Sequence, residues 1–234
     1  MEKSCNENKG SFLVLSGPSG SGKNTLIDFI RETDPTLRHS VSATTRPMRG
    51  SEQEGVAYYF KTREEFEKLV EEGEFIEYDC FNNNYYGTLK KEIEKLLGES
   101  ANVALDLTVP GAVNIKKAFG DRVKTVFILP MSFKTLKERL DKRKTESAEK
   151  IRERIKAAAE NEIGVYGCFD YIIFNDKLED SKRAIISIYR SFRDGGEADI
   201  KEAEKYKQKN QCVRCEELVR SLKKEAEEML AEEK

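Results

Sequence analysis

The chain has 234 residues, in which 41 lysines and arginines nearly balance 43 aspartates and glutamates, giving a formal net charge of -2. That length suits one α/β domain with an appendage, and the balanced charge provides no overall basic field for nucleic acid or an anionic membrane. One histidine and five scattered cysteines, with no secretory signal or long apolar run, favour a reducing cytoplasm. We therefore expect a cytoplasmic protein with no nucleic-acid or membrane partner, and oxygen ligands for any metal ion.

A short apolar run at residues 12–16 ends at Gly17, which predicts a buried strand stopped by a turn. Helical spacing of apolar residues follows over residues 24–31. Three further apolar runs then alternate with three amphipathic stretches, which predicts an α/β fold with a parallel core sheet covered by helices on both faces. The runs cover residues 103–107, 123–130 and 171–174, and the stretches cover residues 112–119, 136–140 and 182–192.

One long region interrupts this alternation. Residues 38–98 lie between the first two predicted core strands and are rich in Thr, Arg, Glu, Asn and Tyr. We expect them to form an inserted subdomain that carries polar function, within a main domain at residues 11–194. The core of that domain would then consist of residues 11–37 and 99–194.

The C-terminal part of the chain has a different composition. An Asp-Gly-Gly sequence after Arg193 predicts a break, and residues 195–234 are mostly charged, with a stripe of apolar side chains that includes Leu218, Leu222 and Met229. This pattern predicts a helical extension that packs on the main domain or on a second copy of the chain. Both a monomer and a homodimer agree with it.

A glycine-rich segment follows the first predicted strand and precedes the first predicted helix. The phosphate-binding pattern G-x-x-x-x-G-K is matched there by Gly17-Pro18-Ser19-Gly20-Ser21-Gly22-Lys23. In such a P-loop the backbone N–H groups turn inward around phosphate oxygens, the helix presents its positive end, and the lysine reaches the β- and γ-phosphates. The segment therefore predicts binding of a nucleoside triphosphate, whereas a chance glycine-rich turn would not require the flanking strand and helix.

The residue after the lysine departs from the usual P-loop. Asn24 stands where a Ser or Thr normally lends its hydroxyl to Mg²⁺. Its amide oxygen, the neighbouring Thr25 or a water molecule would have to fill that coordination place. We assign Asn24 provisionally to the metal and do not assign Thr25 to it.

Further motifs indicate which kind of phosphate transfer to expect. Residues 40–52 read Ser-Val-Ser-Ala-Thr-Thr-Arg-Pro-Met-Arg-Gly-Ser-Glu, and Tyr-Tyr-Phe at 58–60, Glu-Phe-Ile-Glu at 74–77 and Asn-Tyr-Tyr-Gly-Thr at 84–88 follow. In this order after a P-loop, these motifs resemble the guanylate kinase family over roughly residues 11–193. The resemblance implies a P-loop three-layer fold in which the insertion binds a nucleoside monophosphate and residues 139–157 or so form a lid. It also implies ATP-dependent phosphorylation of GMP or dGMP.

The resemblance assigns the acceptor site to the insertion and to one position of the core. Arginine forks match phosphate oxygens in pairs, tyrosine hydroxyls add directional donors, and a carboxylate accepts from the N–H donors of guanine. By resemblance the GMP-binding residues are Ser42, Arg46, Arg49, Tyr58, Glu77, Tyr86, Thr88 and Thr108.

The donor site and the catalytic charges follow from the same resemblance. Besides the seven P-loop residues, Asn24, Thr25 and Asn175 are assigned to ATP, although Asn175 equally suits a simple turn. Asp106, which ends the second core strand, would serve Mg²⁺ through water. The residues expected to neutralise charge during phosphoryl transfer are Lys23, Arg46, Arg139, Arg143 and Arg154.

Three departures from the family keep other readings open. Pro47 and Gly50 each stand one place early, Lys144 replaces a glycine of the lid, and Thr108 replaces an aspartate that helps to read guanine in the family. A kinase for another purine monophosphate or a phosphorylated ribose is therefore one alternative. A guanylate kinase-like module that only binds proteins is another, but such modules typically lose the working P-loop that is retained here.

Overall fold

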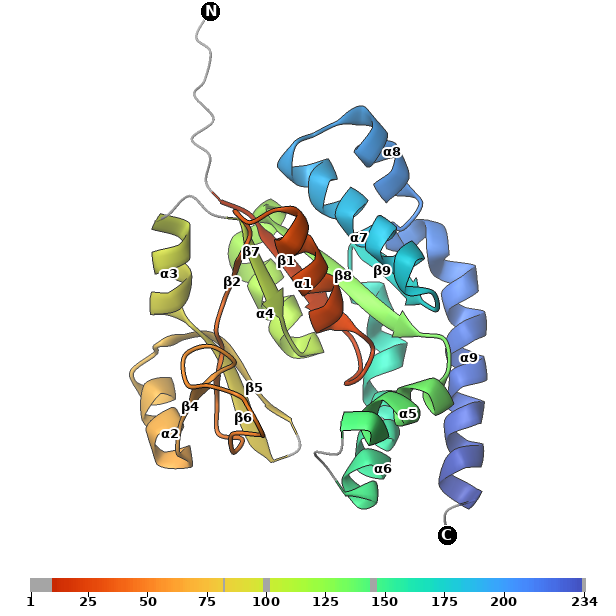
Figure 1. The fold of residues 1–234 in the computed structure, drawn as a ribbon, viewed down its shortest axis with the longest axis horizontal. Helices are drawn as coiled ribbons and strands as arrows, with labels where there is room; N and C mark the ends of the chain where they lie inside the picture. The colour runs from red at the N-terminus through yellow and green to blue at the C-terminus, as the bar shows by residue number, and fades with distance from the viewer. Residues whose placement is uncertain (1–9, 82, 99–101, 144–146, 233–234) are drawn as a thin grey trace, which may run out of the picture.

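A parallel sheet of five strands, in the order β2-β7-β1-β8-β9, forms the centre of the computed structural model (Figure 1). The structure describes residues 10–81, 83–98, 102–143 and 147–232, so that Lys144 lies outside the described residues. The predicted core strands are confirmed. They are β1 (Phe12–Ser16), β7 (Val103–Asp106), β8 (Val123–Pro130) and β9 (Tyr171–Asn175), and a short strand that was not predicted, β2 (Arg38–His39), joins them at one edge of the sheet.

The sheet is buried on both faces because every residue of β1 is buried and its side chains alternate between two cores. Phe12 and Val14 belong to one buried cluster, whereas Leu13 and Leu15 belong to another. The first cluster includes residues of α3 (Lys90–Gly98), α4 (Val109–Phe119), α5 (Phe133–Arg143), α6 (Ala148–Ala157) and α9 (Gln208–Glu232). The second includes residues of α1 (Lys23–Thr33), α7 (Leu178–Arg193) and α8 (Glu197–Glu204).

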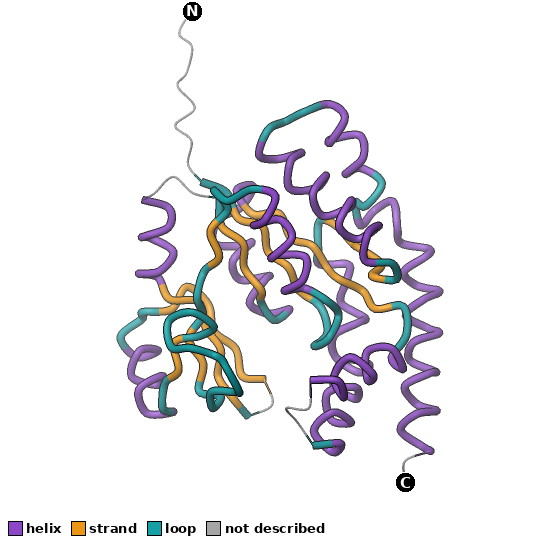
Figure 2. The backbone as a smooth tube through the Cα atoms, viewed as in Figure 1, coloured by secondary structure: helices purple, strands orange, loops and turns teal. Residues whose placement is uncertain are grey.

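A second sheet, with strand order β4-β3-β6-β5, lies between β2 and β7 in the sequence and forms the smaller group of strands in Figure 2. It has its own small core, in which the rings of Phe66 and Phe75 stack with centroids 4.4 Å apart. We expected the insertion to begin at residue 38, but Arg38 pairs with Val103 and so belongs to the core sheet. The elements of the insertion are β3 (Ala43–Thr44), β4 (Tyr59–Phe60), α2 (Arg63–Glu71), β5 (Phe75–Phe81) and β6 (Asn84–Leu89).

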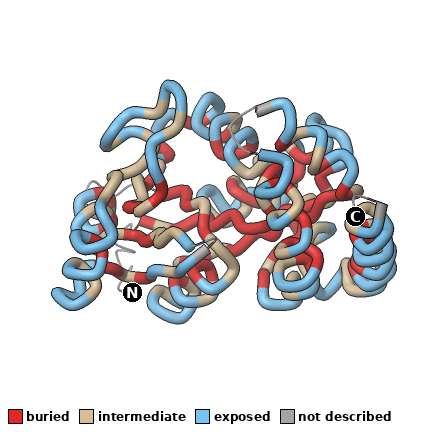
Figure 3. Tube along the Cα trace, turned by 90° about the horizontal axis from the view of Figure 1, so that it is seen from below, coloured by how far each residue is buried: buried red, intermediate tan, exposed pale blue. Residues whose placement is uncertain are grey.

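The charged region after β8 folds into α5 and α6, which carry Arg139 and Arg154 respectively. A π-helical turn (Ala158–Glu162) and a 3₁₀ segment (Ile163–Cys168) lead back to β9, and a shorter 3₁₀ turn (Gly120–Arg122) precedes β8. Figure 3 shows buried residues along the strands and exposed outer faces on the helices. This burial pattern leaves the charged side chains of the two helices at the surface or at the cavity described below.

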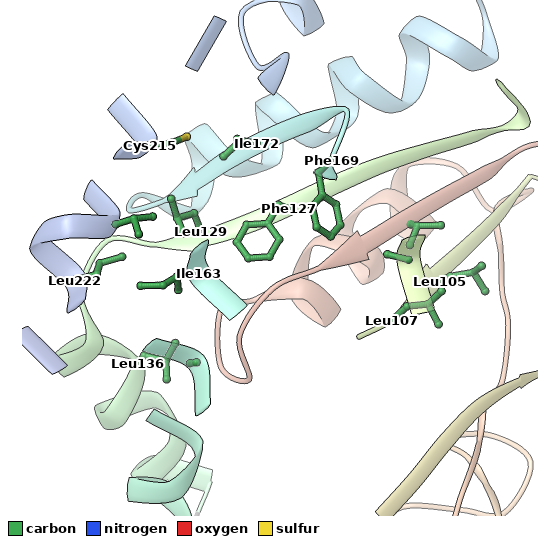
Figure 4. Packing of buried hydrophobic residues seen from close by; sticks show 14 of the residues in the cluster. Leu105, Leu107, Phe127, Leu129, Leu136, Ile163, Phe169, Ile172, Cys215 and Leu222 are labelled. Atoms are coloured by element: carbon green, nitrogen blue, oxygen red, sulfur yellow. The ribbon is translucent and has the colours of Figure 1, made fainter. Parts of the chain in front are cut away.

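The C-terminal extension forms two helices and not the single helix expected from its stripe. Gly195, at φ 67°, provides the predicted break after α7, and residues 205–207 then separate α8 from α9. In α9 the side chains of Cys215, Leu222 and Ala226 are buried in the main core, so the stripe packs on the chain's own domain (Figure 4). None of the described helices is both long and apolar enough to span a bilayer.

Candidate functional site

A cavity of about 700 Å³ lies where the P-loop, the second sheet and the region after α6 meet. Most of the residues predicted for the donor and acceptor sites line it. These are Gly17, Ser19, Gly20, Gly22, Lys23, Asn24, Thr25, Ser42, Arg46, Arg49, Tyr58, Glu77, Tyr86, Asp106, Thr108 and Arg154. Pro18, Ser21, Thr88, Arg139 and Asn175 are not among the lining residues, and the side chain of Arg143 lies outside the described part of the structure.

The P-loop owes its shape to three glycines with positive φ angles. Gly17 (136°), Gly20 (86°) and Gly22 (102°) adopt backbone conformations that side chains disfavour. At Gly17 a Cβ atom would also lie 2.4 Å from the carbonyl oxygen of Ile128, so the loop approaches β8 too closely for any other residue. The chain needs glycine here because the loop must both turn and pack against the sheet.

Lys23 is held by the loop that it follows. Its Nζ donates to the carbonyl oxygens of Gly17 at 2.7 Å and Pro18 at 3.2 Å, and it lies 3.7 Å from a carboxylate oxygen of Asp106. Asp106 ends β7, which pairs with β1, so parallel pairing places this carboxylate beside the P-loop. A cation and an anion thus meet where the loop opens into the cavity.

Asn175 lies behind the P-loop, where the end of β9 meets the loop backbone. Its Nδ2 donates to the carbonyl oxygen of Ser21 at 2.5 Å, and its Oδ1 accepts from the hydroxyl of Ser181 at 2.9 Å. The side chain is only 6 % exposed. In this position it supports the loop that would hold the nucleotide.

Arg46 and Glu52 form a bidentate ion pair in the loop between β3 and β4. The guanidinium, 7 % exposed, donates to the two carboxylate oxygens at 2.9 and 2.8 Å and lies over the ring of Tyr58. Burial opposes ionisation, but the hydrogen bonds and charge of Glu52 outweigh it and raise the pKa of Arg46. Glu52 also accepts from the backbone N–H of Arg49 at 2.8 Å. One carboxylate therefore holds the Arg46 guanidinium and the backbone at Arg49. The sequence marked Glu52 only by its family spacing, and we did not assign it to the site.

The two tyrosines assigned to the acceptor site lie next to each other, with the rings of Tyr58 and Tyr86 6.1 Å apart in an edge-on arrangement. Burial, together with the nearby charge of Asp106, raises the pKa of Tyr58 to about 12. Its hydroxyl therefore stays protonated at neutral pH and can donate a hydrogen bond.

Glu77 is buried at the base of the cavity, with 6 % of its surface exposed. Its Oε1 accepts a hydrogen bond of 2.6 Å from the hydroxyl of Thr88. Burial raises the pKa of Glu77 to about 7, with Asp79 adding to the effect and Thr88 opposing it. The hydroxyl of Thr108 accepts from the backbone N–H of Gly111 at 3.3 Å and so caps α4. Thr108 lines the cavity, but its oxygen already has this structural role.

Charged side chains of α5, α6 and the π-helical turn lie near the P-loop. Arg139 donates to the carbonyl oxygen of Gly20 at 3.4 Å, and Arg154 lines the cavity. Glu162 lines it too, and burial raises its pKa, although the charges of Lys23 and Arg154 act in the opposite direction. Sequence reasoning missed Glu162 because the π-helical turn that points it inward has no sequence signature that we could use.

Comparison with known proteins agrees with this arrangement. A family profile described as guanylate kinase matches residues 9–191. The chain belongs to the guanylate kinase family. It is 43 % identical over 186 residues to a guanylate kinase of Chlorobium luteolum, covering 80 % of this chain and 94 % of that protein.

Two further comparisons agree with this family assignment. A guanylate kinase of Porphyromonas gingivalis is 46 % identical over 168 residues, which are 71 % of this chain and 89 % of that protein. The crystal structure of a guanylate kinase from Anaplasma phagocytophilum superimposes with a TM-score of 0.64 at 33 % identity, covering 79 % of this chain and 87 % of that one. The predicted fold class and family are thereby confirmed, and the whole C-terminal extension, residues 195–234, lies beyond the residues that the family profile matches.

Guanylate kinases use ATP, and the cavity offers oxygen ligands suited to the Mg²⁺ that accompanies it. The Asp106 carboxylate and the Asn24 side chain both line the cavity. Among the residues that the structure describes, no group of three or more His, Cys, Asp or Glu side chains could hold a metal by itself.

Proposed function

We propose that this chain transfers the γ-phosphoryl group of ATP to GMP or dGMP, which forms ADP and GDP or dGDP. The observation that carries the proposal is that the P-loop, the Arg46–Glu52 pair and buried Glu77 all face one cavity. A donor on the loop and an acceptor over the second sheet would then meet inside it. The 40–46 % identity to guanylate kinases over most of the chain supports the same conclusion.

In the proposed complex the chain contributes positioning and positive charge. The P-loop amides and Lys23 hold the donor phosphates, while Arg46, Arg49 and the hydroxyls of Tyr58 and Tyr86 hold the acceptor phosphate. Phosphoryl transfer needs two aligned substrates and neutralised oxygens more than it needs covalent help. Bound Mg²⁺, with Asp106 acting through water and Asn24 beside it, would neutralise part of the phosphate charge.

Base recognition is assigned to Glu77, assisted by Ser42 and Thr88. Ionised Glu77 can accept from the N1–H and the exocyclic amine of guanine, whereas adenine presents an acceptor at N1. Arg139, Arg143 and Arg154 are assigned to a lid that would close over ATP and exclude water. The lining of one cavity by Arg46, Glu77 and Arg154 also supports the region from the end of β2 to residue 98 as the acceptor region, and residues 139–157 or so as the lid.

A related kinase with a different acceptor is the second candidate. Thr108 replaces the family aspartate and uses its hydroxyl to cap α4, so one guanine-reading carboxylate is absent at this position. AMP, IMP and a phosphorylated ribose are therefore the informative competitors. The retained P-loop geometry opposes a module that only binds proteins.

The test uses full-length protein with ATP, Mg²⁺ and a panel of GMP, dGMP, AMP, IMP and ribose 5-phosphate. We expect ADP to form fastest with GMP or dGMP, and Lys23→Met to lower that rate at least about a hundredfold. Reactions without a monophosphate measure the background hydrolysis of ATP. A different best acceptor would establish the second candidate, and no monophosphate-dependent ADP would contradict both kinase functions.

A further inference from the structure

Helix α9 packs against both helices of the proposed lid, although the family match ends at residue 191. Leu222 and Ala226 of α9 share a buried cluster with Leu136 of α5 and Ile151 of α6 (Figure 4). Near the end of α9, the carbonyl oxygen of Leu230 accepts a hydrogen bond of 2.7 Å from the guanidinium of Arg152. The extension is therefore joined to the lid by apolar packing and by polar contacts.

The most specific of these contacts is made by Glu225. Its carboxylate accepts from the hydroxyl of Ser132 at 2.7 Å and from the backbone N–H groups of Phe133 at 3.0 Å and Lys134 at 3.1 Å. The N–H of Thr135 donates to the Ser132 hydroxyl at 3.3 Å. The first three amides of α5, which have no partner within the helix, are thus all satisfied at this end.

This arrangement resembles a capping box whose acid comes from another helix. In an ordinary capping box a Glu three residues after the capping Ser or Thr reaches back to the start of the helix. Here Thr135 occupies that position, and the first turn of α5 contains no acidic residue. Glu225 supplies the missing negative charge at the positive end of the helix dipole. Without α9, α5 would begin with only the Ser132 cap.

We propose that Glu225 is a positioning residue for phosphoryl transfer, acting by fixing the start of α5 relative to the P-loop. Within α5, Arg139 lies two turns beyond this anchor and donates to the carbonyl oxygen of Gly20. A small cavity lined by Ser132, Thr135 and Arg139 also reaches Asn175, which supports the P-loop from behind. A shift at the start of α5 would therefore change the position of Arg139 relative to the P-loop. The inference rests on the proposed kinase function.

Its kinetic test compares Glu225→Gln with wild type and with Glu227→Gln, which removes an exposed acid from the same helix. Because the anchor acts on the donor side, we expect kcat/KM for ATP to fall about three- to tenfold in Glu225→Gln, with the KM for GMP within twofold of wild type. Glu227→Gln should match wild type. Unchanged ATP kinetics in Glu225→Gln, or equal losses for both substrates, would overturn the proposal.

A second measurement does not depend on activity. Amide hydrogen exchange over residues 133–140 should be at least about threefold faster in Glu225→Gln than in Glu227→Gln, while β1 keeps its protection. A wild type with no monophosphate-dependent ADP formation would remove the proposed function but leave this structural test intact. Equal exchange in both variants would show that Glu225 does not fix α5, and exchange that also rises in β1 would show only a global loss of stability.

Discussion

Gly111 and Glu77 lie so close together that a Cβ atom on the glycine would be 2.4 Å from Oε2 of the glutamate. Gly111 is in the first turn of α4, whose cap is Thr108, and Glu77 is on β5 of the second sheet. This contact joins the core to the insertion at the base of the cavity. It explains a glycine inside a helix, where alanine would ordinarily be more stable.

Gly111→Ala should therefore damage acceptor binding more than folding. The added methyl group would push the Glu77 carboxylate from its place beside Thr88, and we expect the KM for GMP to rise about tenfold. The KM for ATP should stay within twofold. Gly98→Ala, at a glycine with nothing within 4 Å of its Cβ position, is the matched control. Wild-type GMP kinetics in Gly111→Ala would show that the helix can shift without moving Glu77.

Acceptor binding should depend on pH through Glu77, whose pKa is raised to about 7 by burial. If the ionised carboxylate reads guanine, the apparent KM for GMP should rise toward tenfold for each pH unit below 7. Glu77→Gln should raise the KM at pH 8 by about tenfold or more and flatten this dependence. The phosphate of GMP titrates equally in both proteins, so a pH profile shared by both would contradict the role of Glu77.

Ionisation of Glu77 should also change the free energy of unfolding, in a direction that its raised pKa determines. The folded pKa of about 7 exceeds the ordinary glutamate pKa of 4.5, so between these pH values the folded chain keeps a proton that the unfolded chain has released. The contribution of Glu77 to stability should therefore fall by about 3 kcal/mol as pH rises through this window. Urea unfolding at pH 5 and pH 8 measures it. Glu77→Gln should lose less stability over the same interval than wild type.

Glu52→Gln tests the ion pair through which Glu52 orients the Arg46 guanidinium. Loss of the carboxylate leaves the buried Arg46 guanidinium without its bidentate partner, so we expect unfolding free energy to drop by about 1–3 kcal/mol. We expect kcat/KM for GMP to fall about tenfold because the Arg46 guanidinium loses its orientation. Glu67→Gln breaks an exposed pair with Arg63 and should change neither value appreciably. Retained activity in Glu52→Gln would mean that Arg46 keeps its orientation through other contacts.

Asn175→Ala tests support of the P-loop from behind. The substitution leaves the buried carbonyl of Ser21 and the hydroxyl of Ser181 without their partner, and we expect the KM for ATP to rise about tenfold with that for GMP unchanged. Asn175→Asp keeps an acceptor for Ser181 but places a carboxylate against a carbonyl oxygen, so it should be at least as damaging. An aspartate variant with wild-type ATP kinetics would rule out a role for the Nδ2 donor.

Local sequence patterns were sufficient to predict much of the proposed donor site. The P-loop, the strands around it and the helices between them were predicted from spacing, because strand burial and loop conformation depend on residues near one another in the chain. Arg46, Arg49 and Tyr58 were instead assigned by the resemblance of the ordered motifs to the guanylate kinase family. Each of these side chains does line the cavity.

The other features of the site depend on contacts between segments that are distant in the sequence. The raised pKa of Glu77, the support that Asn175 gives to the P-loop and the inward position of Glu162 all depend on which surfaces meet after folding. The C-terminal stripe predicted a packed helix without saying where its polar residues would act. Only the tertiary structure brings Glu225 to the start of α5, because desolvation and hydrogen bonding are properties of neighbours in space and not of neighbours in the chain.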